Sequence, residues 1–124
     1  MAIRVLVIDD LPFMRSLVRD ILTDAGMTVV AEAEDGRQGL RAYLASEPDV
    51  VLLDIAMPVM DGLTTLKKLR MLDRRVRVVM CSALGEQEMI VRAIQLGARD
   101  FVIKPFRPER VVSAISKVIQ ADAL

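Results

Sequence analysis

The chain has 124 residues, of which 53% are hydrophobic, and its 17 basic residues balance 17 acidic ones. This length predicts one domain with a single core, which we assign to residues 1–124. A balanced charge gives no general attraction to nucleic acid or to an anionic membrane, and no apolar run approaches the roughly 18 residues that a membrane helix needs. We therefore expect partners to be recognised through local features.

The sequence contains no histidine and a single cysteine, Cys81. Without histidine, Ser/His/Asp and Cys/His catalysis, most zinc sites and a histidine phosphocarrier role are excluded. Cys81 cannot form an internal disulfide and lies in an apolar run, which predicts a buried, inert thiol. The N-terminal apolar segment is too short for a secretory signal and lacks a cleavage-like site, so we expect a cytoplasmic protein.

The first part of the chain alternates short apolar strands with amphipathic helices. Residues 3–8 are rich in β-branched side chains and predict a strand that Asp9 and Asp10 end. Apolar residues at three-and-four spacing then predict a helix from Pro12 to the glycine at position 26. Next we expect a strand at 28–33 and a helix that starts at Asp35-Gly36 and ends before Pro48.

The central strand is expected at residues 50–53, which are apolar without interruption and lead into Asp54. Such a run is typical of a strand covered on both faces. Pro58 prevents a simple continuation of the strand, and Asp61 can cap the helix that follows. The buried stripe of this helix is predicted to consist of leucines: Leu63, Leu66, Leu69 and Leu72.

The last part of the chain repeats the alternation. We expect a strand at 76–81 that ends on Ser82, a helix from about 86 to 96 stopped by Gly97, a brief strand at 100–103 that leads to Lys104, and a final helix opened by Pro108. Five strands that alternate with five helices predict an α/β fold with a parallel sheet wrapped on both faces.

Polar residues stand where four of the five strands end. Function in such sheets collects at the carboxyl ends of the strands, beside the point where the strand order reverses. Three of these residues are aspartates, and three carboxylates close together disfavour joint ionisation, so they predict a bound cation. Mg²⁺ is the natural choice for a site that offers only oxygen ligands. A lysine and a short hydroxyl suit a phosphoryl group, which would make Asp54 the nucleophile. The residues concerned are Asp9, Asp10, Asp54, Ser82 and Lys104.

Each of these residues also has an ordinary structural interpretation when it is taken singly. Asp9 and Asp10 fit acids at a helix start, Lys104 fits a solvated charge, and Ser82 fits a turn hydroxyl. Their joint occurrence at the strand ends favours the phosphoryl site.

These motifs resemble the receiver domains of two-component response regulators, in particular the stand-alone, CheY-like chemotaxis type. The resemblance covers essentially the whole chain and implies a flavodoxin-like, doubly wound sheet with strand order 2-1-3-4-5. The matching stretches are Val7-Ile8-Asp9-Asp10, residues 54–62, Ser82-Ala83 and residues 97–106.

The resemblance implies a role for each site residue. Asp54 would carry the phosphoryl group, and Mg²⁺ would be bound by Asp9, Asp10, Asp54 and the backbone carbonyl of Ala56. Ser82 matches the switching hydroxyl of the family, Phe101 the aromatic switch, and Lys104 the lysine that pairs with the phosphoryl group beside a cis bond to Pro105.

The resemblance also implies partners and a mode of action. A histidine kinase would donate the phosphoryl group, and an output protein such as a flagellar motor switch component would bind the fourth helix, fifth strand and fifth helix. We expect a monomeric switch that assists its own phosphorylation and dephosphorylation and that binds neither nucleic acid nor membrane. The fourth helix carries an apolar arc wider than one packed face needs, which indicates either burial against the fifth helix or a partner-binding surface.

Two positions depart from the family's usual pattern. Ala56 and Leu84 lie two residues beyond Asp54 and Ser82, where the family borders the hydrolytic water, and neither can orient that water. We therefore expect the phosphoryl group to last longer than in a relative that has polar groups at these two positions. Ala56 also stands where a haloacid dehalogenase-like phosphatase places a second aspartate, which disfavours that alternative, whereas a receiver excised from a larger regulator would look identical.

Overall fold

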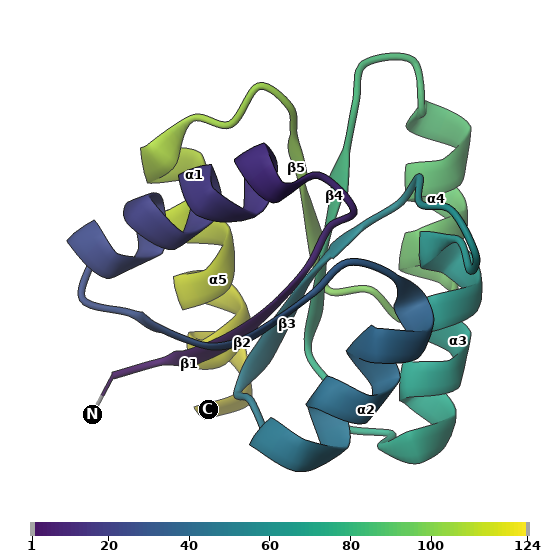
Figure 1. Cartoon of the computed structure of the whole chain (residues 1–124), viewed down its shortest axis with the longest axis horizontal. Helices are drawn as coiled ribbons and strands as arrows, with labels where there is room; N and C mark the ends of the chain where they lie inside the picture. Colours follow the sequence, from purple (N-terminus) through teal and green to yellow (C-terminus); the bar gives the residue numbers. More distant parts are fainter. Residues whose placement is uncertain (1, 124) are drawn as a thin grey trace.

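A computed structural model of the chain describes residues 2–123 as a five-stranded parallel sheet between two layers of helices (Figure 1). The strand order β2-β1-β3-β4-β5 confirms the expected flavodoxin-like topology. The strands are β1 (Arg4–Ile8), β2 (Thr28–Ala33), β3 (Val50–Asp54), β4 (Val78–Ser82) and β5 (Asp100–Ile103), and the helices are α1 (Pro12–Asp24), α2 (Gly36–Ser46), α3 (Gly62–Leu72), α4 (Gln87–Gln95) and α5 (Pro108–Ala123).

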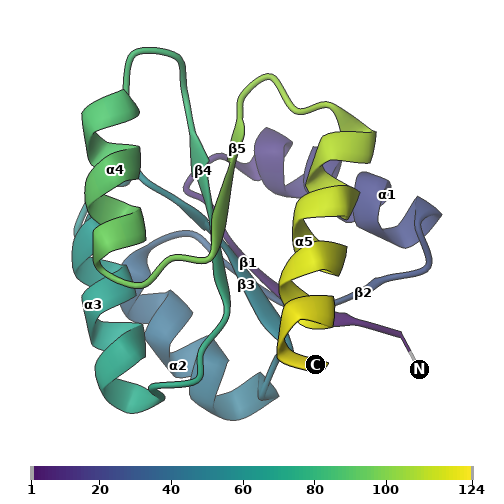
Figure 2. The same ribbon diagram turned by 180° about the vertical axis from the view of Figure 1, so that it is seen from behind.

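The sheet separates two hydrophobic clusters, because successive strand residues point to opposite faces. Helices α1 and α5 cover one face, and α2, α3 and α4 cover the other (Figures 1 and 2). Val7 and Leu52 pack with α1 and α5, whereas Ile8 and Leu53 pack beneath the other three helices. Every residue of β3 and β4 is buried, as expected for strands covered on both sides.

The predicted helix boundaries have local causes. Asp35 and Asp61 cap α2 and α3, since their carboxylates accept hydrogen bonds from the backbone N–H groups three residues on. Gly26 and Gly97 follow α1 and α4 with φ of +80° and +109°, a left-handed conformation that glycine adopts at little cost. Cys81 is buried, as predicted.

Two details differ from the sequence-based expectations, and a third bears on the two interpretations of the apolar arc of α4. The fourth strand starts at Val78 rather than at Val76, because the Val76 N–H closes a turn onto the Asp73 carbonyl. Leu72 is 46% exposed, since α3 ends there beyond the leucines that face the sheet. Helix α4 packs on α3 and β4, so its buried stripe lies away from α5.

No helix within residues 2–123 is both long enough and apolar enough to cross a membrane.

Candidate functional site

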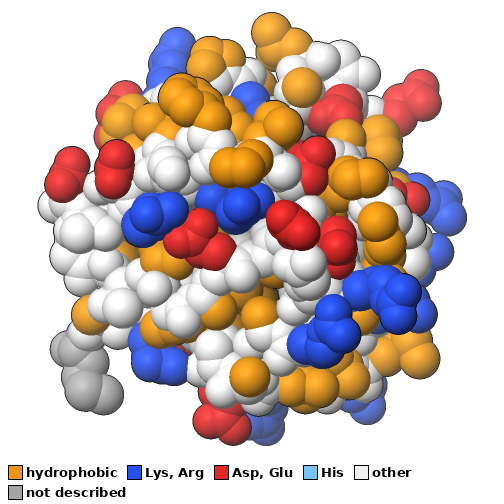
Figure 3. Space-filling view, viewed as in Figure 1, with side chains coloured by type: hydrophobic (Ala, Val, Ile, Leu, Met, Phe, Trp, Pro, Cys, Tyr) orange, Lys and Arg blue, Asp and Glu red, His pale blue; other side chains and the backbone are white. Residues whose placement is uncertain are grey.

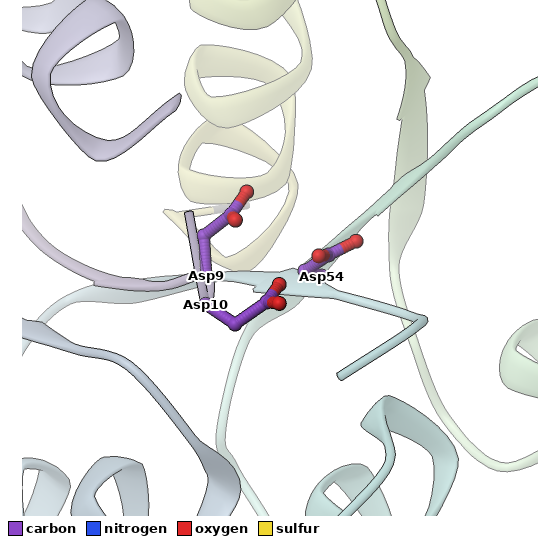
Figure 4. A group of neighbouring side chains, drawn as sticks. All are labelled: Asp9, Asp10 and Asp54. Atoms are coloured by element: carbon purple, nitrogen blue, oxygen red, sulfur yellow. The ribbon is translucent and has the colours of Figure 1, made fainter. Parts of the chain in front are cut away.

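Three carboxylates meet at the edge of the sheet where the strand order reverses. Strands β1 and β3 are parallel neighbours with Ile8 opposite Leu53, so Asp9 and Asp54 leave the sheet at the same level. One carboxylate oxygen each from Asp9, Asp10 and Asp54 lies within 4.8 Å of the others (Figure 4). Asp9 and Asp54 are each only 4% exposed. The structure therefore brings together the three acids that the sequence placed at strand ends.

The neighbouring backbone and α1 hold Asp9 in position. Its N–H donates to the Ala33 carbonyl at 3.0 Å, and its Oδ1 accepts from the Leu11 N–H at 3.0 Å. The guanidinium of Arg15 donates to the Asp9 carbonyl oxygen at 2.6 Å and also contacts Glu32 at 3.5 Å. The second oxygen, Oδ2, remains directed to the site.

Lys104, which directly follows the edge strand β5, bridges two of the acids. Ile103 pairs with Ser82, and the Lys104 N–H donates to the Ser82 carbonyl at 2.8 Å, which fixes where the lysine leaves β5. Its Nζ lies 3.1 Å from Asp9 Oδ2 and 3.3 Å from Asp54 Oδ2. The bond from Lys104 to Pro105 is cis.

The electrostatics of the site follow from burial and from the shared charges. Burial raises the pKa of Asp54 to about 6; the negative charges of Asp9 and Asp10 add to this effect, and Lys104 opposes it. Burial disfavours the charge on Lys104, but Asp54 and Asp9 outweigh that effect and leave its pKa above the ordinary value. Three carboxylates therefore face one ammonium group, and the excess negative charge suits a cation.

The loop between β3 and α3 folds tightly against the strand end. The Gly62 N–H donates to the Ile55 carbonyl at 2.7 Å, and a Cβ at position 62 would lie 2.3 Å from the Asp54 carbonyl oxygen. Only glycine permits this close approach. Ala56 is exposed in the same loop, and Val59 adopts a left-handed φ of +68°, which is a strained conformation for a β-branched residue.

Ser82 and Phe101 lie on the opposite side of the site from Asp9. The Ser82 side chain is 1% exposed, and its Oγ has no hydrogen-bond partner among the described residues. A buried hydroxyl without a partner is costly, so the Ser82 Oγ is available to donate to a group bound at the site. Ser82 and Phe101 both line an apolar cavity of about 450 Å³ between α4 and β5, so space for side-chain movement exists beside them.

Sequence reasoning missed two residues that shape the site. An arginine in the first turns of α1 looks like a solvated charge, so nothing in the pattern indicated that Arg15 would reach back to the Asp9 carbonyl. Gly62 was expected only at a helix start, whereas the structure shows that its lack of a side chain lets the loop contact β3.

Comparison with known proteins agrees with the geometry. Residues 5–116 match the family model described as the response regulator receiver domain. The chain is 50% identical over 119 residues to the chemotaxis protein CheY of Bacillus subtilis (strain 168), covering 96% of this chain and 99% of that protein. It is 45% identical over 115 residues to the chemotaxis protein CheY of Thermotoga maritima, covering 93% and 96%.

A solved structure shows the same fold. CheY in the CheX-CheY-BeF₃-Mg²⁺ complex from Borrelia burgdorferi superposes with a TM-score of 0.89 at 33% identity, covering 94% of this chain and 88% of that one. The chain thus belongs to the response regulator receiver domain family, as a CheY-like phosphoacceptor protein of two-component signalling.

Proposed function

We propose that this protein is a phosphorylation-dependent switch in which Asp54 accepts a phosphoryl group from a histidine kinase. The observation that carries the proposal is the convergence of Asp9, Asp10 and Asp54 within 4.8 Å under the ammonium group of Lys104. An in-line phosphoryl transfer requires the protein to position the reacting groups and to neutralise charge. Carboxylates from separate strands, joined by one lysine, can do both.

The acids fit a divalent cation of the hard type. The ligand atoms that meet in the cluster are all carboxylate oxygens, which Mg²⁺ prefers, so Asp9, Asp10 and Asp54, with the carbonyl of Ala56, would hold Mg²⁺. When bound, Mg²⁺ supplies Lewis acidity toward the phosphoryl oxygens. The presence of Mg²⁺ in the Borrelia burgdorferi complex supports this choice.

In the proposed transfer, an ionised oxygen of Asp54 forms the new O–P bond while the P–N bond to the kinase histidine breaks. The departing nitrogen takes the electron pair and is then protonated by solvent. Lys104, which already lies 3.3 Å from Asp54, would pair with the transferred oxygens and neutralise their charge. Burial raises the pKa of Asp54 to about 6 when no cation is bound, and bound Mg²⁺ would favour the ionised carboxylate that attacks phosphorus.

The unpartnered hydroxyl of Ser82 supports a route from the site to the surface. An acyl phosphate at Asp54 would offer acceptor oxygens to Ser82, and movement of Ser82 would change the space next to Phe101. Phe101 is half-buried and lines hollows on two sides, toward α4 and toward Lys104. The two arrangements need differ by only a few kcal/mol for phosphorylation to shift their populations.

The surface formed by α4, β5 and α5 would carry the output. Val91 and Ile94 of α4 are 57% and 43% exposed although α4 already buries another stripe, so apolar surface is left for a partner. The chemotaxis relatives support a flagellar motor switch component as that partner. The histidine kinase would contact a different surface, which includes the exposed Leu11 and Phe13 beside the proposed phosphorylation site.

Phosphorylation by a small-molecule phosphodonor such as acetyl phosphate tests the proposal. We expect the wild-type chain to gain one phosphoryl group only when Mg²⁺ is present, and we expect Asp54→Asn to gain none. The matched control is Asp20→Asn, which removes an exposed carboxylate of α1 and should leave phosphorylation unchanged. Labelling that is equal with and without Mg²⁺, or that persists in Asp54→Asn, would contradict the proposal.

A further inference from the structure

Helices α2 and α3 lie on the other side of the sheet from α5 (Figure 1), and side chains of both helices line a hollow between them. A cavity of about 300 Å³ is lined there by Leu40, Arg41, Leu44, Lys68, Met71 and Leu72. A shallower hollow of about 360 Å³ adjoins it and adds two residues, Arg37 and Met60. We call these eight residues the α2–α3 groove.

Several apolar side chains of the α2–α3 groove are exposed to solvent and do not contribute to the core. Leu44, Met71 and Leu72 are 62%, 83% and 46% exposed, whereas Leu66 and Leu69 of the same layer are fully buried. Exposed apolar side chains that gather in a hollow are characteristic of a binding surface, because isolated ones would be scattered over the molecule.

The walls of the groove are held in place by a side-chain contact between the helices. The Tyr43 hydroxyl of α2 donates a 2.8 Å hydrogen bond to Asp73 at the end of α3. Burial, followed by this hydrogen bond, raises the pKa of Tyr43, so the phenol stays protonated and remains a donor. A groove with fixed walls loses less entropy when a partner binds.

The charged side chains of the groove are all basic. Arg37 and Arg41 are one helical turn apart on α2, where like charges repel, and Lys68 faces them from α3. All three are exposed, and none makes a hydrogen bond or an ion pair within residues 2–123. Figure 3 shows blue side chains side by side there, with orange apolar atoms around them. Among the described residues, no acidic side chain lines either hollow.

We propose that the α2–α3 groove docks an amphipathic helix of a partner protein whose polar face is acidic. The apolar face of such a helix would enter between Leu40, Leu44 and Met71, and its carboxylates would pair with the three cations. This docking is independent of phosphorylation at the strand ends and of the α4–β5–α5 surface.

The surface just beyond the Leu44 end of the groove favours a protein over an anionic membrane. A separate hollow there is lined by Leu44, Glu47 and Asp73, and its two acids would repel lipid phosphates. The change from basic side chains in the groove to acidic ones beyond it would orient the partner helix. Its acidic end would lie over Arg37 and Arg41, and any basic end would lie over Glu47 and Asp73. The apolar side chains also line a hollow, which receives a helix better than it inserts into a flat bilayer.

Synthetic helical peptides of about 16 residues test this proposal on the full chain. Three peptides share one apolar face and carry Glu, Gln or Lys on the polar face. Backbone amide chemical shifts of the labelled protein report both the site and the affinity. We expect the Glu peptide to perturb amides of 36–46 and 62–72, the Gln peptide to bind about tenfold more weakly, which is ~1.4 kcal/mol, and the Lys peptide to bind more weakly still.

Charge reversal identifies the residues responsible. The triple variant Arg37→Glu, Arg41→Glu, Lys68→Glu should lose binding of the Glu peptide by tenfold or more and gain affinity for the Lys peptide. The matched control reverses three exposed cations elsewhere and should bind as wild type does: Arg92→Glu, Arg107→Glu and Lys117→Glu. Equal melting temperatures of both triples show that folding is intact.

Several outcomes would overturn the proposal. One is shifts confined to α4 and β5, and another is equal affinity for the Glu and Gln peptides. A third is unchanged binding by the groove triple variant. Vesicles containing phosphatidylglycerol that bind wild type but not the groove variant, while the Glu peptide binds neither, would assign the surface to a membrane instead.

Discussion

Replacing Asp54 by asparagine is expected to make the folded protein more stable, although it removes the proposed phosphoacceptor. Burial raises the pKa of Asp54 in the folded protein from its ordinary value of 3.8 to about 6. Below pH 3.8 the side chain is protonated in both the folded and the unfolded states and costs nothing. As the pH rises toward 6, the unfolded chain ionises first, so the stability of the wild-type fold decreases, and above pH 6 the deficit stays constant.

The size of the effect follows from the two pKa values. Each pH unit by which the folded-state pKa is raised corresponds to ~1.4 kcal/mol. The free energy of unfolding of Asp54→Asn should therefore exceed that of wild type by roughly 1 to 2 kcal/mol at pH 5 and by about 3 kcal/mol at pH 7. Asparagine approximates the protonated aspartate, because both are neutral and similar in size.

Urea unfolding followed by far-ultraviolet circular dichroism measures this difference, since the chain has no tryptophan and one tyrosine. The series runs from pH 4.5 to 8 with a chelator present. Asp20→Asn is the control and should show no such pH-dependent gain. Mg²⁺ at 100 times its dissociation constant would stabilise wild type by about 2.7 kcal/mol and so nearly cancel the advantage of the variant. A stability difference that is the same at pH 5 and pH 7 would refute the reasoning.

Three further predictions concern the loops around the site. Ala56→Asn combined with Leu84→Glu should shorten the lifetime of the phosphoryl group on the order of tenfold by orienting water, as followed by ³¹P NMR; an unchanged decay rate would count against the role given to these positions. Val59→Asn should raise the free energy of unfolding by about 1 kcal/mol in urea because asparagine tolerates a left-handed φ, whereas Val91→Asn on α4 should give no gain. Gly62→Ala should cost about 3 kcal/mol, since its Cβ would meet the backbone of β3 at 2.3 Å; a loss below 1 kcal/mol would show that the loop yields easily.

Much of the fold was predictable because its signals are local. Uninterrupted apolar runs located the strands, capping aspartates and glycines located the helix ends, and the alternation of the two indicated a parallel sheet. The convergence of Asp9, Asp10 and Asp54 was predictable from the topology, since the carboxyl ends of parallel strands gather at one edge. The roles of Asp54, Ser82 and Lys104 stay predictions until they are measured.

Other features depend on tertiary packing or on side-chain rotamers and leave no trace in local patterns. The packing partner of α4 depends on how three helices share one face of the sheet. The contact from Arg15 to the Asp9 carbonyl depends on a side-chain rotamer. Leu72 fits the leucine repeat of α3, yet it is exposed because the helix ends past the sheet and opens the α2–α3 groove.

The chemical location of the transferred phosphoryl group tests the central claim most directly. Protein treated with a phosphodonor and Mg²⁺ is reduced with borohydride, which converts an aspartyl phosphate to homoserine, and the product is mapped by tandem mass spectrometry. We predict homoserine at position 54 alone, and none when Mg²⁺ is omitted. Homoserine at position 9 or 10, or an unmodified Asp54 in protein that carries phosphate, would contradict the account.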